Sequence, residues 1–229
     1  MINKRSLLTS SSRRRFLKQA SAAGAALAIT SWFEIPGAYA TALTETPRLT
    51  EGPFYPDHLP LDRDNDLIII GDSTTPAMGT ITHLSGRIMD ITGSPIRDAT
   101  IEIWQVDNYG SYINSHGILN GRRDSNFQGY GQFLTDSSGE YRFRTIEPVP
   151  YPGRTPHIHV RVKRGNRELL TTQCFIRGHK FNRSDGILNG IWNPKQRQAI
   201  LVDFSPIPGS VTGEVNAQFD IVLGLTPAA

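Results

Sequence analysis

The sequence predicts an all-β protein, a β-sandwich preceded by an extended N-terminal arm. Short segments that alternate apolar and polar residues recur along most of the chain. Turn-forming residues separate them, with 21 glycines and 15 prolines among 229 residues. Hydrophobic residues make up 38% of the chain and charged residues 20%, which suits a packed core. Many short strands joined by such turns are typical of a sandwich or barrel.

The first forty residues predict an export signal. A twin-arginine pattern, Ser12–Lys18, precedes an apolar run from Ala20 to Phe33 and a small-residue cleavage site at Ala38-Tyr39-Ala40. The apolar run is too short for a membrane span. We therefore expect residues 1–40 to be a twin-arginine signal peptide and the protein to be periplasmic or extracellular. The alternatives are an N-terminal anchor or a basic arm that binds nucleic acid.

The charge of the remaining chain argues against a nucleic-acid partner. Removing residues 1–40 takes away six of the 24 basic residues and one of the 21 acidic residues, so the net charge falls from +3 to −2. No membrane span is expected in the mature chain. The single cysteine, Cys174, excludes an internal disulfide and a cysteine-rich zinc site. Because the twin-arginine route carries folded proteins, often with a cofactor loaded, a metal protein is a reasonable hypothesis.

The elements are expected in the following order. Residues 41–79 are rich in Pro, Asp and Thr and predict the arm, and residues 80–229 predict the sandwich domain. Strands are expected at 81–91, 99–106, 131–135, 140–145, 157–163, 168–176, 198–204 and 217–223. Turn signals at 136–139 and 164–167 predict two hairpins, and a short helix is expected only near 194–197. The polar stretch 111–130 predicts a functional loop.

One strand carries a possible metal-binding pair. His157 and His159 alternate with Ile158, so both imidazoles point to one face, where they can reach one metal or simply face solvent. No acidic residue occurs between Glu147 and Glu168, so a carboxylate ligand near the pair is missing. Tyr151, in a proline-rich loop, is a candidate oxygen ligand, and a phenolate favours Fe(III).

At this point the sequence resembles the intradiol ring-cleavage dioxygenases, and most closely the β chain of the protocatechuate 3,4-dioxygenases. The matching motifs are Thr50–Tyr55, Ile103-Trp104-Gln105, Gly110-Ser111-Tyr112, Asn126–Asp136, Tyr141–Ile146, Pro150–His159 and Gln173-Cys174-Phe175. Their order and spacing span most of the chain after residue 50. The resemblance implies a prealbumin-like β-sandwich.

The resemblance also implies a metal site. One non-haem Fe(III) per chain would be held by Tyr112, Tyr151, His157 and His159. Tyr109 is a rival for Tyr112, although its offset from the Trp-Gln strand fits less well. Arg154 and Gln173 match catalytic residues of the family, or they are a surface charge and a polar group on an exposed strand.

The implied reaction is cleavage of a catechol ring by O2, with Tyr151 as base and Arg154 stabilising negative charge, to give a muconate-type diacid. Protocatechuate or a related catechol is the expected substrate, and no other cofactor is implied. Arg122 and Arg123 either meet a substrate carboxylate or are solvated charges. The chain is expected to form a homo-oligomer or a hetero-oligomer with a sister chain. Two alternatives stay open: a non-catalytic binding module, and a copper-binding export protein using the two histidines.

Overall fold

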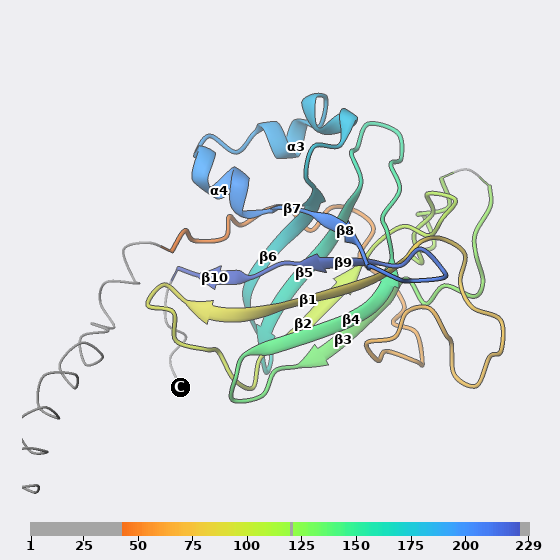
Figure 1. Cartoon of the computed structure of the whole chain (residues 1–229), viewed down its shortest axis with the longest axis horizontal. Coiled ribbons are helices and arrows are strands. Elements are labelled where there is room, and N and C mark those ends of the chain that lie inside the picture. The colour runs from red at the N-terminus through yellow and green to blue at the C-terminus, as the bar shows by residue number, and fades with distance from the viewer. Residues whose placement is uncertain (1–42, 120, 225–229) are drawn as a thin grey trace, which may run out of the picture. The chain divides into compact units, whose positions relative to one another are not determined.

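Two β-sheets form the protein, as the sequence predicts (Figure 1). This computed structural model describes residues 43–119 and 121–224, so the predicted signal peptide at 1–40 lies outside the described residues. Among the described residues, no helix is both long and apolar enough to cross a bilayer.

Each sheet has five strands. In the first sheet the order is β10-β1-β9-β8, and β4 pairs with β1 on its other edge. In the second sheet the order is β3-β2-β5-β6-β7. The strands are β1 (Ile81–Asp90), β2 (Thr100–Trp104), β3 (Tyr130–Leu134), β4 (Glu140–Ile146), β5 (His157–Arg164), β6 (Arg167–Ile176), β7 (Leu201–Val202), β8 (Phe204–Pro206), β9 (Val215–Gln218) and β10 (Ile221–Leu223).

The helical content differs from the prediction. Besides α4 (Pro194–Ala199), which was expected, the chain forms a 3-10 helix η1 (Lys180–Arg183) and a short helix α3 (Gly186–Asn189). Helices of four residues are too short to show the apolar period of a helix, which explains why the sequence pattern missed them. Side-chain caps start them instead, as when Asp185 accepts the N–H groups of Ile187 and Leu188.

Two expected strands are interrupted. The segment 217–223 breaks into β9 and β10 at Phe219, whose carbonyl accepts a hydrogen bond from the Tyr141 hydroxyl. Gly86 is needed opposite this break, because a Cβ there would overlap the Phe219 carbonyl. The segment 198–204 begins as the end of α4, and strand pairing starts only at Leu201.

The two faces of strand β5 carry different side chains, and one face lies against the hydrophobic core. Ile158, Val160 and Val162 are fully buried in the hydrophobic core. Because side chains alternate along a strand, His157 and His159 point to the opposite face. Cys174 on β6 also lies in the core, where it packs as a small hydrophobic residue and burial raises the pKa of its thiol.

The segment 43–79 has no helix or strand among its described residues, apart from an isolated bridge at Asp66, yet it is fixed to the sandwich. Leu67 and Ile68 are fully buried in the core. The Leu49 N–H donates to the Thr171 carbonyl at 2.8 Å. The segment therefore packs into the core through Leu67 and Ile68 and covers the histidine side of the second sheet near Gly52, where a Cβ would lie 3.6 Å from His159 Cε1.

Candidate metal centre

The two histidines of β5 are held by their neighbours on both sides. His159 pairs with Trp104 on β2 and with Gln173 on β6, while His157 pairs with Phe175. The Trp104 ring stacks on the His159 imidazole, with ring centres 4.8 Å apart and planes 12° apart. Both histidines are 2% exposed. The Thr155 carbonyl lies 2.6 Å from His157 Nδ1, and the Nε2 atoms of the two histidines lie 3.2 Å apart.

Tyr112 comes from the loop after β2. The Asp107 carboxylate accepts the N–H groups of Tyr109 and Ser111, which turns the chain back toward the sheet. Tyr112 is fully buried, and the Phe54 ring stacks on it at 4.9 Å. The rival Tyr109 lies elsewhere, with its hydroxyl on the Met78 sulfur and its ring under the Arg122 guanidinium.

A tight turn places Tyr151 and Arg154 together. Pro152 and Gly153 occupy its two central positions, and the Arg154 N–H donates to the Tyr151 carbonyl at 2.9 Å. Gly153 has a φ of +80°, which this turn needs and glycine adopts without strain. The local sequence thus brings the Tyr151 hydroxyl to within 3.3 Å of Arg154 Nη1.

The structure brings the four proposed ligands to one point. Tyr112 Oη lies 2.9 Å from His159 Nε2, 3.3 Å from His157 Nε2 and 3.4 Å from Tyr151 Oη. Tyr151 Oη lies 3.5 Å from His157 Nε2. We call these four residues the Tyr-His cluster.

The spacing of the Tyr-His cluster fits a shared metal ion. Donor atoms that bind one metal at about 2 Å lie about 2.8 Å apart at a right angle and about 3.3 Å apart at the tetrahedral angle. The observed distances of 2.9 to 3.5 Å fall close to this range. Across the described part of the chain, no group of three or more His, Cys, Asp or Glu side chains is arranged to hold a metal. A metal site here therefore depends on the tyrosines.

The protonation of the cluster favours a cation as well. His157 Nδ1 lies 2.6 Å from the Thr155 carbonyl, which fixes Nδ1–H as donor and leaves a lone pair on Nε2. Burial and the nearby Arg154 charge lower the pKa of His157 to about 3, and burial also lowers that of His159, so both rings are neutral. Burial raises the pKa of Tyr112. Lone pairs that converge in a dry site are stabilised by a bound cation.

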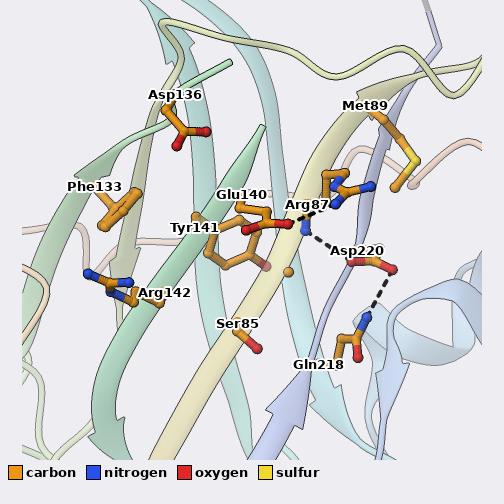
Figure 2. A pocket seen from close by; sticks show the side chains of 11 residues that line it. Ser85, Arg87, Met89, Phe133, Asp136, Glu140, Tyr141, Arg142, Gln218 and Asp220 are labelled. Atoms are coloured by element: carbon orange, nitrogen blue, oxygen red, sulfur yellow. Dashed lines mark hydrogen bonds and ion pairs between the residues drawn. The ribbon is translucent and has the colours of Figure 1, made fainter. Parts of the chain in front are cut away.

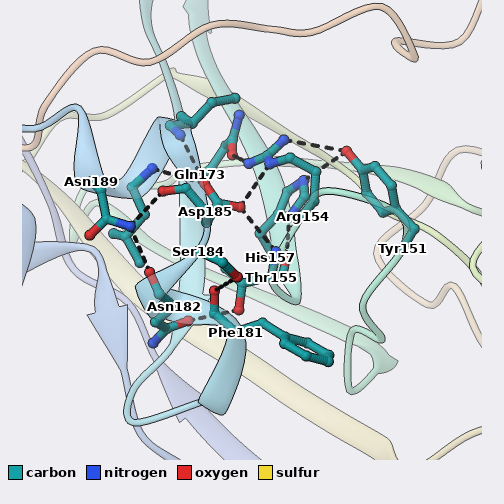
Figure 3. Close-up of polar contacts among 12 residues, drawn as sticks. Tyr151, Arg154, Thr155, His157, Gln173, Phe181, Asn182, Ser184, Asp185 and Asn189 are labelled. Carbon is teal, nitrogen blue, oxygen red and sulfur yellow. Dashed lines mark hydrogen bonds and ion pairs between the residues drawn. The ribbon is translucent and has the colours of Figure 1, made fainter.

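Arg154 and Gln173 form the second layer of the site (Figure 3). Arg154 donates through Nη2 to Gln173 Oε1 at 2.5 Å and through Nε to Asp185 Oδ2 at 2.8 Å. Gln173 in turn donates to the Thr50 carbonyl at 3.0 Å. The Arg154 side chain is 13% exposed, so neither residue is the surface group that the sequence left as an alternative.

Sequence reasoning missed Asp185 and Thr155. Asp185 is 31 positions from Arg154, and Thr155 contributes its backbone rather than its side chain to His157. The only sequence signal for Asp185 is that of a helix cap before Gly186-Ile187-Leu188. A cap signal does not tell which cation the carboxylate will meet.

A cavity of about 420 Å³ opens beside the Tyr-His cluster. Its wall consists of Pro150, Tyr151, Pro152, Gly153, Arg154, Phe181 and Ser184. Tyr151 is the only cluster residue that is not fully buried. Access to the cluster therefore leads past Tyr151 and Arg154.

A second hollow, of about 500 Å³, lies over β1, β4 and the break between β9 and β10 (Figure 2). Arg87 binds two of its acidic residues: the guanidinium binds Glu140 at 2.7 Å, and the backbone N–H binds Asp220 at 2.9 Å. No residue of the Tyr-His cluster lines it. The cavity beside the Tyr-His cluster is therefore the candidate site.

Fold and site together define a class of protein, a β-sandwich with two tyrosines and two histidines converging beside a cavity. A profile of the dioxygenase family matches residues 50–224. The chain therefore belongs to this family and is an enzyme of the intradiol ring-cleavage type. This result favours the enzyme over the non-catalytic binding module and the copper protein that the sequence left open.

Several relatives support the assignment. The chain is 31% identical to the protocatechuate 3,4-dioxygenase beta chain of Burkholderia cepacia, over 70% of this chain and 71% of that one. It is 28% identical to a hydroxyquinol 1,2-dioxygenase of Rhodococcus opacus, over 75% of this chain and 61% of that one. The chain thus spans less than two thirds of the hydroxyquinol enzyme.

Solved structures agree with the fold. The dioxygenase domain of a carbohydrate-binding fusion protein from Streptomyces sp. SirexAA-E superposes with a TM-score of 0.59 at 28% identity, covering 80% of this chain and 100% of that domain. Catechol 1,2-dioxygenase from Acinetobacter sp. ADP1 gives a TM-score of 0.59 at 26% identity, covering 92% of this chain and 69% of that one.

Proposed function

We propose that the protein uses one Fe(III) ion to cleave a catechol-type ring between its two hydroxylated carbons. Both atoms of O2 enter the product, a muconate-type diacid, so no other oxidant or reductant is needed. The observation that carries the proposal is the Tyr-His cluster, with two phenol oxygens and two imidazole nitrogens within 2.9 to 3.5 Å beside a cavity. When bound, Fe(III) would supply the Lewis-acid and redox chemistry that joins the diol to O2.

The protein's own residues divide the remaining tasks. Tyr112, His157 and His159 are buried and would hold the ion. Tyr151 is partly exposed and lines the cavity, so its phenolate oxygen is the group placed to take a proton from the incoming diol. Arg154 Nη1 lies 3.3 Å from that oxygen, where a fixed cation stabilises negative charge on the diol side.

The cavity supports an uncharged catechol as substrate. Pro150, Pro152 and Phe181 give it an apolar wall, and Arg154 is the only cation among the described residues that line it. The Arg154 charge is already balanced by the buried Asp185 carboxylate at 2.8 Å. Neither Arg122, which stacks on Tyr109, nor Lys180, which lies over the Phe181 ring, lines the cavity.

Protocatechuate and its methyl ester form a matched pair for this substrate. They have nearly the same shape, and the ester withdraws electrons from the ring at least as strongly as the carboxylate. A higher kcat/KM for the ester would then reflect the charge alone. Preference for protocatechuate would mean that a cation reaches the cavity in solution.

The proposed function is tested by iron and colour. The purified protein should hold about one iron per chain and be red-brown from tyrosinate bound to Fe(III). Catechol added without O2 should shift this absorption, and His159→Ala should remove both iron and colour. A colourless wild-type protein that has been supplied with iron, or a normally coloured His159→Ala variant, would contradict the ligand assignment.

We also propose that residues 1–40 direct twin-arginine export of the loaded enzyme, because Arg13 and Arg14 stand before an apolar run and a cleavage site. Replacing both arginines with lysine should leave the protein in the cytoplasm. Continued export of this variant would rule the route out.

A further inference from the structure

A buried carboxylate outside the Tyr-His cluster connects the parts of the site. Asp185 has a fully buried side chain and accepts four hydrogen bonds. Its Oδ2 accepts from Arg154 Nε at 2.8 Å and from the Thr155 N–H at 3.0 Å. Its Oδ1 accepts from the N–H groups of Ile187 and Leu188 at the start of α3.

We infer that Asp185 is a positioning residue that aims the Arg154 guanidinium at the reacting diol, an inference that rests on the proposed function. A guanidinium is planar, so fixing the direction of Nε fixes the two other nitrogens as well. With Nε on Asp185, Nη2 reaches Gln173 and Nη1 reaches the Tyr151 hydroxyl. Figure 3 shows Arg154 held between these three partners.

Asp185 Oδ2 also holds the backbone next to His157. The Thr155 N–H that binds Asp185 Oδ2 belongs to the residue whose carbonyl accepts from His157 Nδ1 at 2.6 Å. Asp185 therefore holds the backbone that sets the His157 tautomer. Its other oxygen, Oδ1, caps α3. This helix begins two residues after Ser184, which lines the cavity together with Phe181.

A role as a helix cap alone does not account for these contacts. Asn193 caps the neighbouring α4 in the same way, accepting from the N–H groups of Lys195 and Gln196, and it is an amide. A cap needs one oxygen, whereas Asp185 uses its second oxygen for Arg154 and Thr155. The negative charge matters for the second task, because Arg154 is largely buried and needs a counter-ion.

Asp185→Asn separates the two tasks. Its amide oxygen can still cap α3, while its NH2 group would face the Arg154 and Thr155 N–H donors. We expect normal iron content, a folded protein whose unfolding temperature is lowered because the buried ion pair with Arg154 is lost, and kcat and kcat/KM lower together by about 10- to 100-fold with KM unchanged. The visible absorption band of the resting enzyme should shift as well, because Arg154 no longer donates to Tyr151. Asp185→Ser, which keeps a capping oxygen, should behave alike.

A double-mutant cycle with Arg154→Ala decides between the roles. If Asp185 acts through Arg154, adding Asp185→Asn to Arg154→Ala should lower kcat no further, whereas independent effects would multiply. Asn193→Ala, which removes only a cap, should lower the unfolding temperature and leave kcat unchanged.

Three outcomes would overturn the inference: wild-type kcat in both Asp185 variants, multiplying effects in the cycle, or failure of both variants to fold and hold iron. Failure of the proposed function would look different, since wild-type enzyme would then not cleave catechol. The shift of the absorption band in Asp185→Asn is read without turnover.

Discussion

The variant Arg154→Ala tests two roles of Arg154, its contribution to the stability of the fold and its contribution to catalysis. The change removes a cation that is 13% exposed and paired with a fully buried carboxylate at 2.8 Å. It leaves Tyr151, Tyr112 and both histidines in place, so iron and colour should be kept. Two quantities should change, the free energy of unfolding and kcat.

The expected loss of stability follows from what remains around Asp185. Breaking a buried ion pair by removing one partner typically costs about 3–5 kcal/mol. Asp185 keeps three backbone donors, from Thr155, Ile187 and Leu188. We therefore expect a loss at the lower end of this range, about 3 kcal/mol, measured by denaturant unfolding of the iron-loaded protein.

The variant should also lose most of its kcat, although it stays folded and keeps its iron. Removing one fixed group that stabilises developing charge lowers kcat by about 10²–10³. The assay is O2 uptake at saturating catechol with iron measured in the same sample. A variant that keeps its iron and full kcat would refute the role of Arg154, whatever its stability.

Three further predictions follow from the same geometry. Tyr151→Phe should keep iron on Tyr112 and the two histidines, weaken the colour and slow catechol binding, whereas Tyr109→Phe should leave spectrum and kcat as in wild type. Removing iron with a chelator should lower the unfolding temperature, because an ion at 100 times its Kd adds about 2.7 kcal/mol; equal unfolding temperatures would argue against a native metal site. Burial would raise the pKa of Asp185, but hydrogen bonds from Leu188, Arg154 and Thr155 lower it overall. The ionised carboxylate should therefore stabilise the fold above about pH 4, and this stabilisation should disappear as the pH falls through the folded-state pKa. In acid unfolding, the stabilities of wild type and Asp185→Asn should become equal below that pKa.

The strands that build the site were predictable because their pattern is local. The alternation in His157–Lys163 placed both histidines on one face, and β5 runs from His157 to Arg164. Tyr151 was a candidate because its proline-rich loop precedes the histidine pair, and Arg154 was singled out by the resemblance. The Pro152-Gly153 turn shows in physical terms why the two lie together.

Other parts of the site depend on contacts between distant residues. Nothing in the local sequence distinguishes Tyr112, stacked on Phe54, from Tyr109, which lies under Arg122. Asp185 reaches Arg154 only because η1 and α3 fold back over the loop that carries it, and neither short helix has a periodic pattern. The family resemblance favoured Tyr112 over Tyr109, and only the structure revealed the contact between Asp185 and Arg154.

The origin of the product's oxygen atoms shows most directly whether the protein cleaves a catechol ring between its hydroxylated carbons with O2. Iron-loaded enzyme would be given catechol under 18O2, and the product would be analysed at early times by mass spectrometry. We predict a cis,cis-muconate carrying two labelled oxygen atoms, with the bond between the hydroxylated carbons broken. A ring-intact product, or a semialdehyde from cleavage next to the diol, would contradict it.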